Sequence, residues 1–214
     1  MHTIQLTSEP ATPVQAADHG CDVDLAFEFL NTRELEQGDL VDRLTSAEDA
    51  LDWIVGQGLV HDVAASSERA RLASDPARSE RVLANVRAVR DALREIADAV
   101  TESRAPDDAA VRTVNSALRA RPVDELVVID GVVRLSHGHA EDPFAEALAR
   151  LAEPIVEEIS EGHPERLRVC ANDTCRWVFF DSSRSGRRRW CDMTTCGNRA
   201  KAARHRARQK EQQA

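Results

Sequence analysis

Residues 170–210 read CANDTCRWVFFDSSRSGRRRWCDMTTCGNRAKAARHRARQK and hold four of the chain's five cysteines. The cysteines form two pairs, Cys170 with Cys175 and Cys191 with Cys196, with four residues inside each pair and fifteen between the pairs. Two thiol pairs joined by a loop of this length are typical of a tetrahedral site made of four cysteines. The spacing therefore predicts one structural Zn²⁺ per chain, held by these four residues.

The context of these cysteines favours a metal over disulfides. No apolar run approaches the roughly 20 residues of a membrane span, and the first residues lack the basic and apolar regions of a signal peptide. We therefore expect a cytoplasmic protein without a membrane partner, in which thiols stay reduced. A segment of about 45 residues buries too little apolar surface to fold alone, so the metal would supply much of its folding free energy. Two disulfides or free buried thiols are the alternatives.

The charge is divided unevenly along the chain. Residues 163–214 contain 13 of the 28 Lys and Arg but only 5 of the 37 Asp and Glu, which gives +8. The remaining 15 basic and 32 acidic residues give the rest of the chain −17. Such an asymmetry indicates that one part of the chain contacts nucleic acid or another polyanion.

The basic residues near the cysteines fall into two groups. One group lies in a Ser- and Gly-rich loop before Trp190, which we expect to be flexible, and the other lies in an Ala-rich helix after Cys196. A basic helix that grows from the last zinc ligand suits the phosphate backbone of a nucleic acid, although a solvated helix without a partner is the alternative. The candidate contacts are Arg184, Arg187, Arg188, Arg189, Arg199, Lys201, Arg204, Arg206 and Arg208.

The acidic part of the chain has the pattern of a helical domain. Residues 79–101 carry apolar side chains in alternating steps of four and three, which predicts a helix packed inside the domain. Ser46 with Asp49 marks the start of an earlier helix that ends at Gly56 or Gly58.

The remaining segments are less uniform. A second helix is expected after Pro106, and another over residues 143–161. Asp130-Gly131 between two apolar runs predicts a β-hairpin. Residues 64–78 suit a loop or a short helix, and residues 23–30 fit both a strand and a helix.

The expected organisation has three parts. Residues 1–20 are polar and aperiodic, which predicts a disordered leader. Residues 21–162 form an acidic, mostly helical domain that we expect to fold without the rest, and residues 163–214 form the finger, because Gly162-His163-Pro164 interrupts the pattern where the charge reverses. The expected fold class is mainly α with a small β-hairpin (α+β), followed by a small four-cysteine zinc finger of the zinc-ribbon or treble-clef kind that ends in a basic helix.

The C-terminal residues resemble the CGNR zinc-finger family. The resemblance is carried by Cys170, Cys175, the RRWC block at 188–191 and the CGNRAK block at 196–201. Upstream, LAFEFLNT at residues 25–32, followed by Trp53, resembles the ABATE domain that usually precedes this finger. The resemblance implies a stress-induced bacterial transcription regulator whose finger binds DNA.

Our leading hypothesis is a DNA-binding regulator in which residues 21–162 sense a signal or form a homodimer. An RNA-binding protein, with Trp177 and Trp190 stacked on unpaired bases, is one alternative. An enzyme or ligand-binding domain that the finger targets, and a redox sensor that uses the zinc thiolates, are the others. The sequence has no nucleophile motif, phosphate-binding loop or catalytic dyad, so we do not expect an enzyme. Asn31 and Thr32 form a polar pair after an apolar run, and the pair either holds a buried turn or contacts a ligand.

Overall fold

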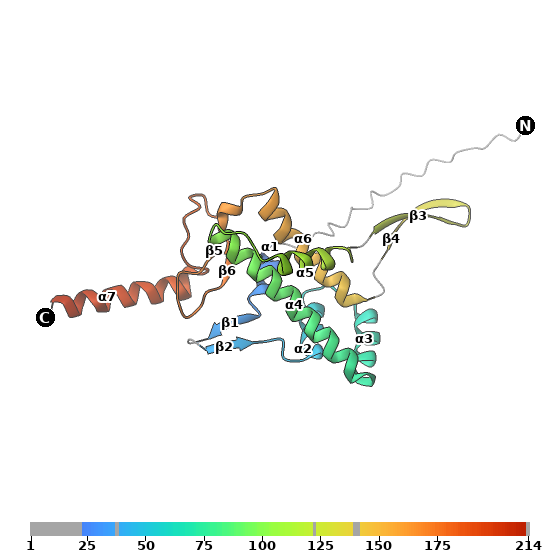
Figure 1. The fold of residues 1–214 in the computed structure, drawn as a ribbon, viewed down its shortest axis with the longest axis horizontal. Helices are drawn as coiled ribbons and strands as arrows, with labels where there is room; N and C mark the ends of the chain where they lie inside the picture. The colour runs from blue at the N-terminus through green and yellow to red at the C-terminus, as the bar shows by residue number, and fades with distance from the viewer. Residues whose placement is uncertain (1–22, 37–38, 122, 139–141, 213–214) are drawn as a thin grey trace, which may run out of the picture.

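The computed structural model describes residues 23–36, 39–121, 123–138 and 142–212 (Figure 1). The leader expected over residues 1–20 lies outside these ranges. The described chain is mainly helical with small two-stranded sheets and ends in a cysteine cluster followed by a helix, which confirms the expected fold class. The elements in chain order are α1 (Val23–Leu30), β1 (Arg33–Glu36), β2 (Asp39–Asp42), α2 (Ala47–Gly56), α3 (Asp62–Ser74), α4 (Pro76–Thr101), α5 (Asp108–Leu118), β3 (Val123–Ile129), β4 (Val132–Gly138), α6 (Pro143–Ser160), η1 (Pro164–Arg166), β5 (Leu167–Val169), β6 (Val178–Phe180), η2 (Met193–Gly197) and α7 (Asn198–Gln212).

The core forms around α4, the long helix that crosses the middle of the molecule (Figure 1). Its alternating apolar stripe is buried at Val82, Val86, Val89 and Leu93, which confirms the expected packing inside the domain. The other helices of the acidic part place Phe29, Leu51, Leu72, Val114, Leu148, Leu151 and Ile155 against this stripe. None of the helices among the described residues is both long and apolar enough to cross a membrane.

Local signals set several element boundaries as expected. Ser46 and Asp49 form a capping box at the start of α2, in which each side chain accepts a hydrogen bond from the other residue's backbone. Asp130 and Gly131 form the turn of the β3–β4 hairpin with φ of 53° and 78°. Two successive residues in the left-handed region are what a tight hairpin turn requires, and the Asp-Gly sequence permits them.

A buried charge explains why the sequence left a loop and a short helix open over residues 64–78. Residues 62–74 form the full helix α3, in which Glu68 occupies a core position with only 1% exposure. Arg78 of α4 lies 2.7 Å from Glu68 and compensates its charge. Because Glu68 is charged, the buried positions of α3 do not show the apolar periodicity by which a packed helix is recognised in a sequence.

A second buried ion pair holds the β1–β2 hairpin, which the sequence did not predict. Arg90, 1% exposed in the middle of α4, donates two hydrogen bonds of 2.7 Å to the carboxylate of Asp42 and one of 3.1 Å to Thr32. Burial would raise the pKa of Asp42, but the hydrogen bonds from Arg90 and Leu44 and the charges of Arg90 and Arg87 keep it below its ordinary value. The ion pair therefore fixes β2 against the central helix.

The β5–β6 ribbon lies between the helical part and the cysteine loops. Side chains alternate across a strand, so neighbouring residues face opposite sides of the ribbon. Leu167 and Val178 are 2% and 0% exposed and belong to the same buried cluster as α1, α4 and α6. Phe179 faces the other way and joins a second cluster with Cys170 and Cys196. The helical part and the finger thus share a continuous core through this ribbon.

Candidate metal centre and basic surface

Four thiols converge at the end of the β5–β6 ribbon. The Sγ atoms of Cys170, Cys175, Cys191 and Cys196 all lie within 4.8 Å of one another. The distance is 3.7 Å between the Sγ atoms of Cys175 and Cys191 and 3.9 Å between those of Cys191 and Cys196. Sulfurs bound to one tetrahedral Zn²⁺ at about 2.3 Å are about 3.8 Å apart, so the four residues fit such an ion. None of the four forms a disulfide.

The first cysteine pair lies on a tight loop that returns to the ribbon. The N–H of Cys170 donates to the carbonyl of Trp177 at 2.8 Å, and the N–H of Cys175 donates to that of Asn172 at 2.9 Å. The backbone amides of Asn172 and Trp177 act to lower the pKa of Cys170 and of Cys175, although burial outweighs this effect at Cys175. Arg176, with φ of 60°, turns the chain back into β6.

The second cysteine pair ends in a turn of π-helix, residues 193–197, that leads directly into α7. Asp192 caps this turn by accepting a hydrogen bond of 2.7 Å from the N–H of Thr195. A Cβ at position 197 would lie 2.7 Å from the sulfur of Met193, so a larger residue there would push the end of the Met193 side chain aside. Asn198 closes the turn by donating to the carbonyl of Thr194 at 3.0 Å.

In the absence of a cation, the pKa values of the clustered thiols differ from one another. A hydrogen bond from Cys191 lowers the pKa of Cys170 to about 5. Burial raises the pKa of Cys175 to about 12, and the hydrogen bond to Cys170, burial and the neighbouring thiolates raise the pKa of Cys191. A divalent cation offsets the repulsion between thiolates and allows all four to bind deprotonated.

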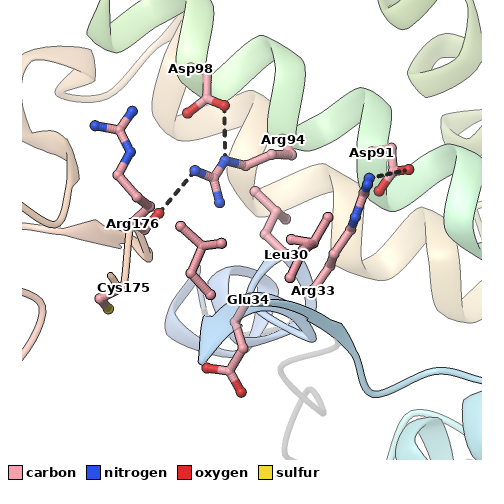
Figure 2. Close-up of a pocket in the computed structure, with 10 residues that line it drawn as sticks. Leu30, Arg33, Glu34, Asp91, Arg94, Asp98, Cys175 and Arg176 are labelled. Carbon is pink, nitrogen blue, oxygen red and sulfur yellow. Dashed lines mark hydrogen bonds and ion pairs between the residues drawn. The ribbon is translucent and has the colours of Figure 1, made fainter. Parts of the chain in front are cut away.

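A groove separates this centre from the helical part and is shown in Figure 2. It has a volume of about 330 Å³ and lies between β1, β2, α4 and the Cys175 loop. Arg94 spans it, pairing with Asp98 at 3.0 Å and donating to the carbonyl of Arg176 at 2.9 Å. Arg33 pairs with Asp91 at 3.1 Å at the other end. The bond from Arg94 to Arg176 crosses the groove, so the groove lies at the contact between the helical part and the finger.

Comparison with known families assigns both parts of the chain. The model of the ABATE family, described as "Putative stress-induced transcription regulator", matches residues 23–162, more than half of the chain. The chain belongs to the ABATE family. In this ABATE protein the model of the CGNR zinc finger matches residues 166–209, directly after the helical part. No curated protein matches the chain.

The four letters that name the finger have separate roles in this ABATE protein. Cys196 presents a thiol to the metal centre, Gly197 makes room for Met193, and Asn198 bonds Thr194. Arg199 is exposed at the start of α7.

Most of the predicted basic contacts lie on an open surface. α7 projects away from the body of the molecule (Figure 1), and residues 201–209 are all exposed. The loop before Trp190 adds Arg184, Arg187 and Arg189, which are exposed as well. The structure therefore brings eight of the nine predicted cations to the surface, and the ninth, Arg188, is half-buried.

The basic loop is held in place, in contrast to the flexible loop that its composition suggests. Asp181, fully buried, accepts hydrogen bonds from the N–H groups of Ser183 at 3.0 Å and Arg188 at 2.7 Å. Burial would raise the pKa of Asp181, but these bonds and the charge of Arg188 lower it. The guanidinium of Arg188 donates to the carbonyl of Cys191 and lies 5.0 Å from the ring centre of Phe179. Arg188 thus stabilises the metal centre through its contacts with Cys191 and Phe179.

Asn31 connects the end of α1 to the finger. Its side chain donates to the carbonyl of Val178 at 2.9 Å and accepts from the N–H of Val178 at 3.0 Å. Both ends of the amide are therefore used by one backbone residue of β6, and the side chain is 6% exposed. Trp177 adds a second connection by donating from Nε1 to Glu34 at 2.6 Å. These partners support the structural interpretation of Asn31.

Proposed function

We propose that this ABATE protein is a zinc-dependent, DNA-binding transcription regulator whose finger contacts the DNA. The observation that carries the proposal is α7, which begins directly after the last thiol and exposes a basic surface over residues 201–209. No acidic residue lies between Asp192 and Glu211. The metal centre would hold the first turn of this helix at a defined angle, so that its cations meet a phosphate backbone together.

The loop before Trp190 extends the same basic surface. Arg189 and Arg204 lie 5.2 and 5.9 Å from the centre of the Trp190 ring, one from the loop and one from α7. The two basic groups therefore meet at this residue, although they are separate in the sequence. Phosphate contacts from both would account for affinity but carry no base preference.

The surroundings of the tryptophans favour duplex DNA over unpaired bases. Trp190 carries two guanidinium groups over its ring, and the indole N–H of Trp177 is used by Glu34. Proteins that bind single strands expose aromatic faces on which bases stack. The two guanidinium groups compete with a base for the Trp190 ring, and Trp177 is half-buried against the cysteine cluster. The proposal assigns the described residues no catalytic role.

The proposal is tested by competition binding of the zinc-loaded full chain with duplex DNA, single-stranded DNA and RNA of the same length. Duplex DNA is expected to compete best at low salt. Stronger competition by single strands or RNA would replace the DNA proposal with the RNA-binding alternative. An absence of affinity for all three at low salt would leave α7 as a solvated helix and refute the proposal.

The purified protein is expected to contain one zinc per chain. The reason is that the four Sγ atoms lie within 4.8 Å of one another and match one tetrahedral ion. Elemental analysis of protein purified without chelator measures the ratio. Cys196→Ser is expected to remove the metal, whereas Thr194→Ser, on the same turn, is expected to retain it. A metal-free wild-type protein, or full metal content in Cys196→Ser, would contradict the four-cysteine site.

The double substitution Arg206→Ala with Arg208→Ala is expected to weaken both the binding of duplex DNA and the dependence of this binding on salt. Each phosphate contact contributes about 0.9 to the slope of log affinity against log salt, so the double variant is expected to flatten the slope by about 2. Titrations over a salt series measure both quantities. Arg112→Ala with Arg119→Ala, two exposed residues of the helical part, is the control with the same change in charge. Equal effects of the two variants would show that net charge, and not α7, determines binding.

A further inference from the structure

The exposed aliphatic side chains of the described chain are concentrated on the β3–β4 hairpin. This hairpin projects from the helical body (Figure 1), and seven of its side chains are at least 50% exposed: Val123, Leu126, Val128, Ile129, Val132, Val133 and Leu135. The other large apolar side chains exposed in the described ranges are scattered over the surface, at Leu40, Val63, Val111 and Met193. A concentration of this kind marks an interaction site.

Four of the seven side chains form one continuous face of the hairpin. Leu126 lies opposite Leu135, and Val128 opposite Val133. Residues opposite each other in an antiparallel pair point to the same side, so these four make up an aliphatic surface, here called the leucine face. A two-stranded hairpin is marginally stable in water unless one face is covered. The hairpin therefore needs a partner on the leucine face.

The chemistry of the hairpin restricts what this partner is. The leucine face consists of uncharged side chains, so it offers nothing to a phosphate backbone. Asp130, exposed at the tip, places a carboxylate where the hairpin would first enter a lipid bilayer. Burying a charge in this way is costly. These properties favour a protein surface that is itself aliphatic.

We propose that the leucine face packs against the same face of a second copy of the chain across a twofold axis. An interface of this symmetry uses one patch twice and requires that the patch complement itself. An uncharged aliphatic face meets this requirement, and among the described residues such a face is found on this hairpin. The proposal does not depend on nucleic-acid binding.

The area of the leucine face sets the expected strength of the dimer. With exposures of 75%, 69%, 63% and 57%, its four side chains leave on the order of 450 Å² open on each copy, or about 900 Å² in a dimer. This total lies at the low end of specific interfaces. The dimer is therefore expected to dissociate on dilution and not to be permanent.

Sedimentation of the full-length protein from about 1 µM to about 100 µM tests the proposal. The average mass is expected to rise with concentration from the 23.6 kDa of one chain towards twice that value. Leu126→Thr with Leu135→Thr keeps strand-forming residues but removes both leucines, and is expected to weaken dimerisation at least tenfold. Val128→Thr with Val133→Thr is expected to act in the same direction through the other cross-strand pair. Val63→Thr, at an exposed position of α3, is the matched control and is expected to leave dimerisation unchanged.

The outcomes are distinguishable. A wild-type protein that stays monomeric over the whole range would overturn the proposal, and so would a dimer that both double variants leave intact. Circular dichroism of each variant confirms that the helical body is unchanged, since the substituted side chains lie on the surface.

Discussion

Removal of the metal from the full-length protein is expected to lower the thermal midpoint of its helices, and not only to unfold the finger. The cause is the shared core, because Leu167 and Val178 of the ribbon are buried among side chains of α1, α4 and α6. Each such side chain contributes about 1.5–3 kcal/mol when buried, and a loss of several kcal/mol corresponds to a midpoint about 10 °C lower in a chain of this size. Far-UV circular dichroism with and without a chelator measures the shift.

The control for this experiment is Cys196→Ser, which is expected to have the lower midpoint already and to respond little to the chelator. An unchanged helical midpoint after complete loss of zinc from the wild-type protein would contradict the coupling. It would support instead the independent helical domain that the break at residues 162–164 suggests.

Replacing Asn31 by alanine is expected to destabilise the protein by about 2–6 kcal/mol. The substitution leaves two buried groups of Val178, its N–H and its carbonyl, without partners, and each costs about 1–3 kcal/mol. Asn31→Asp has nearly the same shape but turns an oxygen towards the carbonyl of Val178, so it is expected to be at least as destabilising. Chemical denaturation measures both free energies of unfolding.

Asn115→Ala, at an exposed position of α5, is the matched control and is expected to change the free energy by about 0.5 kcal/mol or less. If Asn31→Asp were tolerated at this level, the paired hydrogen bonds would not be what holds α1 to the finger.

The sequence predicted features whose signals are local. Cysteine spacing brought four ligands into one cluster, the Asp-Gly pair specified a hairpin turn, and Ser46 with Asp49 specified a helix start. Each of these signals lies close to the structure that it specifies, and even the two cysteine pairs are only fifteen residues apart. The alternating stripe of α4 is of the same kind, since it needs only the periodicity of one helix.

The features that the sequence did not predict depend on residues far apart in the chain. Asn31 stood out in a polar pair that follows an apolar run, but its partner Val178 lies 147 positions away. Arg90 and Glu68 occupy core positions only because Asp42 and Arg78 compensate their charges. The boundary at residues 162–164 was visible as a break in pattern, but the shared core across it depends on how the β5–β6 ribbon docks.

The basic loop shows the same limitation at shorter range. Its Ser, Gly and Arg content is that of a mobile segment, and the sequence does not show that Asp181 is buried beneath it. Arg166 adds to this support by donating to the carbonyls of Asp181 and Ser183 at 2.9 and 3.0 Å. Two basic residues near the cysteines, Arg166 and Arg188, therefore maintain the shape of the surface that the exposed cations form.

The most direct test of the central claim, that the metal-supported basic surface contacts the nucleic acid, is hydrogen–deuterium exchange of the zinc-loaded full chain with and without duplex DNA at low salt. The account predicts slower exchange in α7 and in residues 182–190 when DNA is present, because contacts there suppress fraying of an exposed helix and loop. Exchange in α2 to α6 is expected to stay the same. Protection confined to the helical part, with α7 unaffected, would contradict the account.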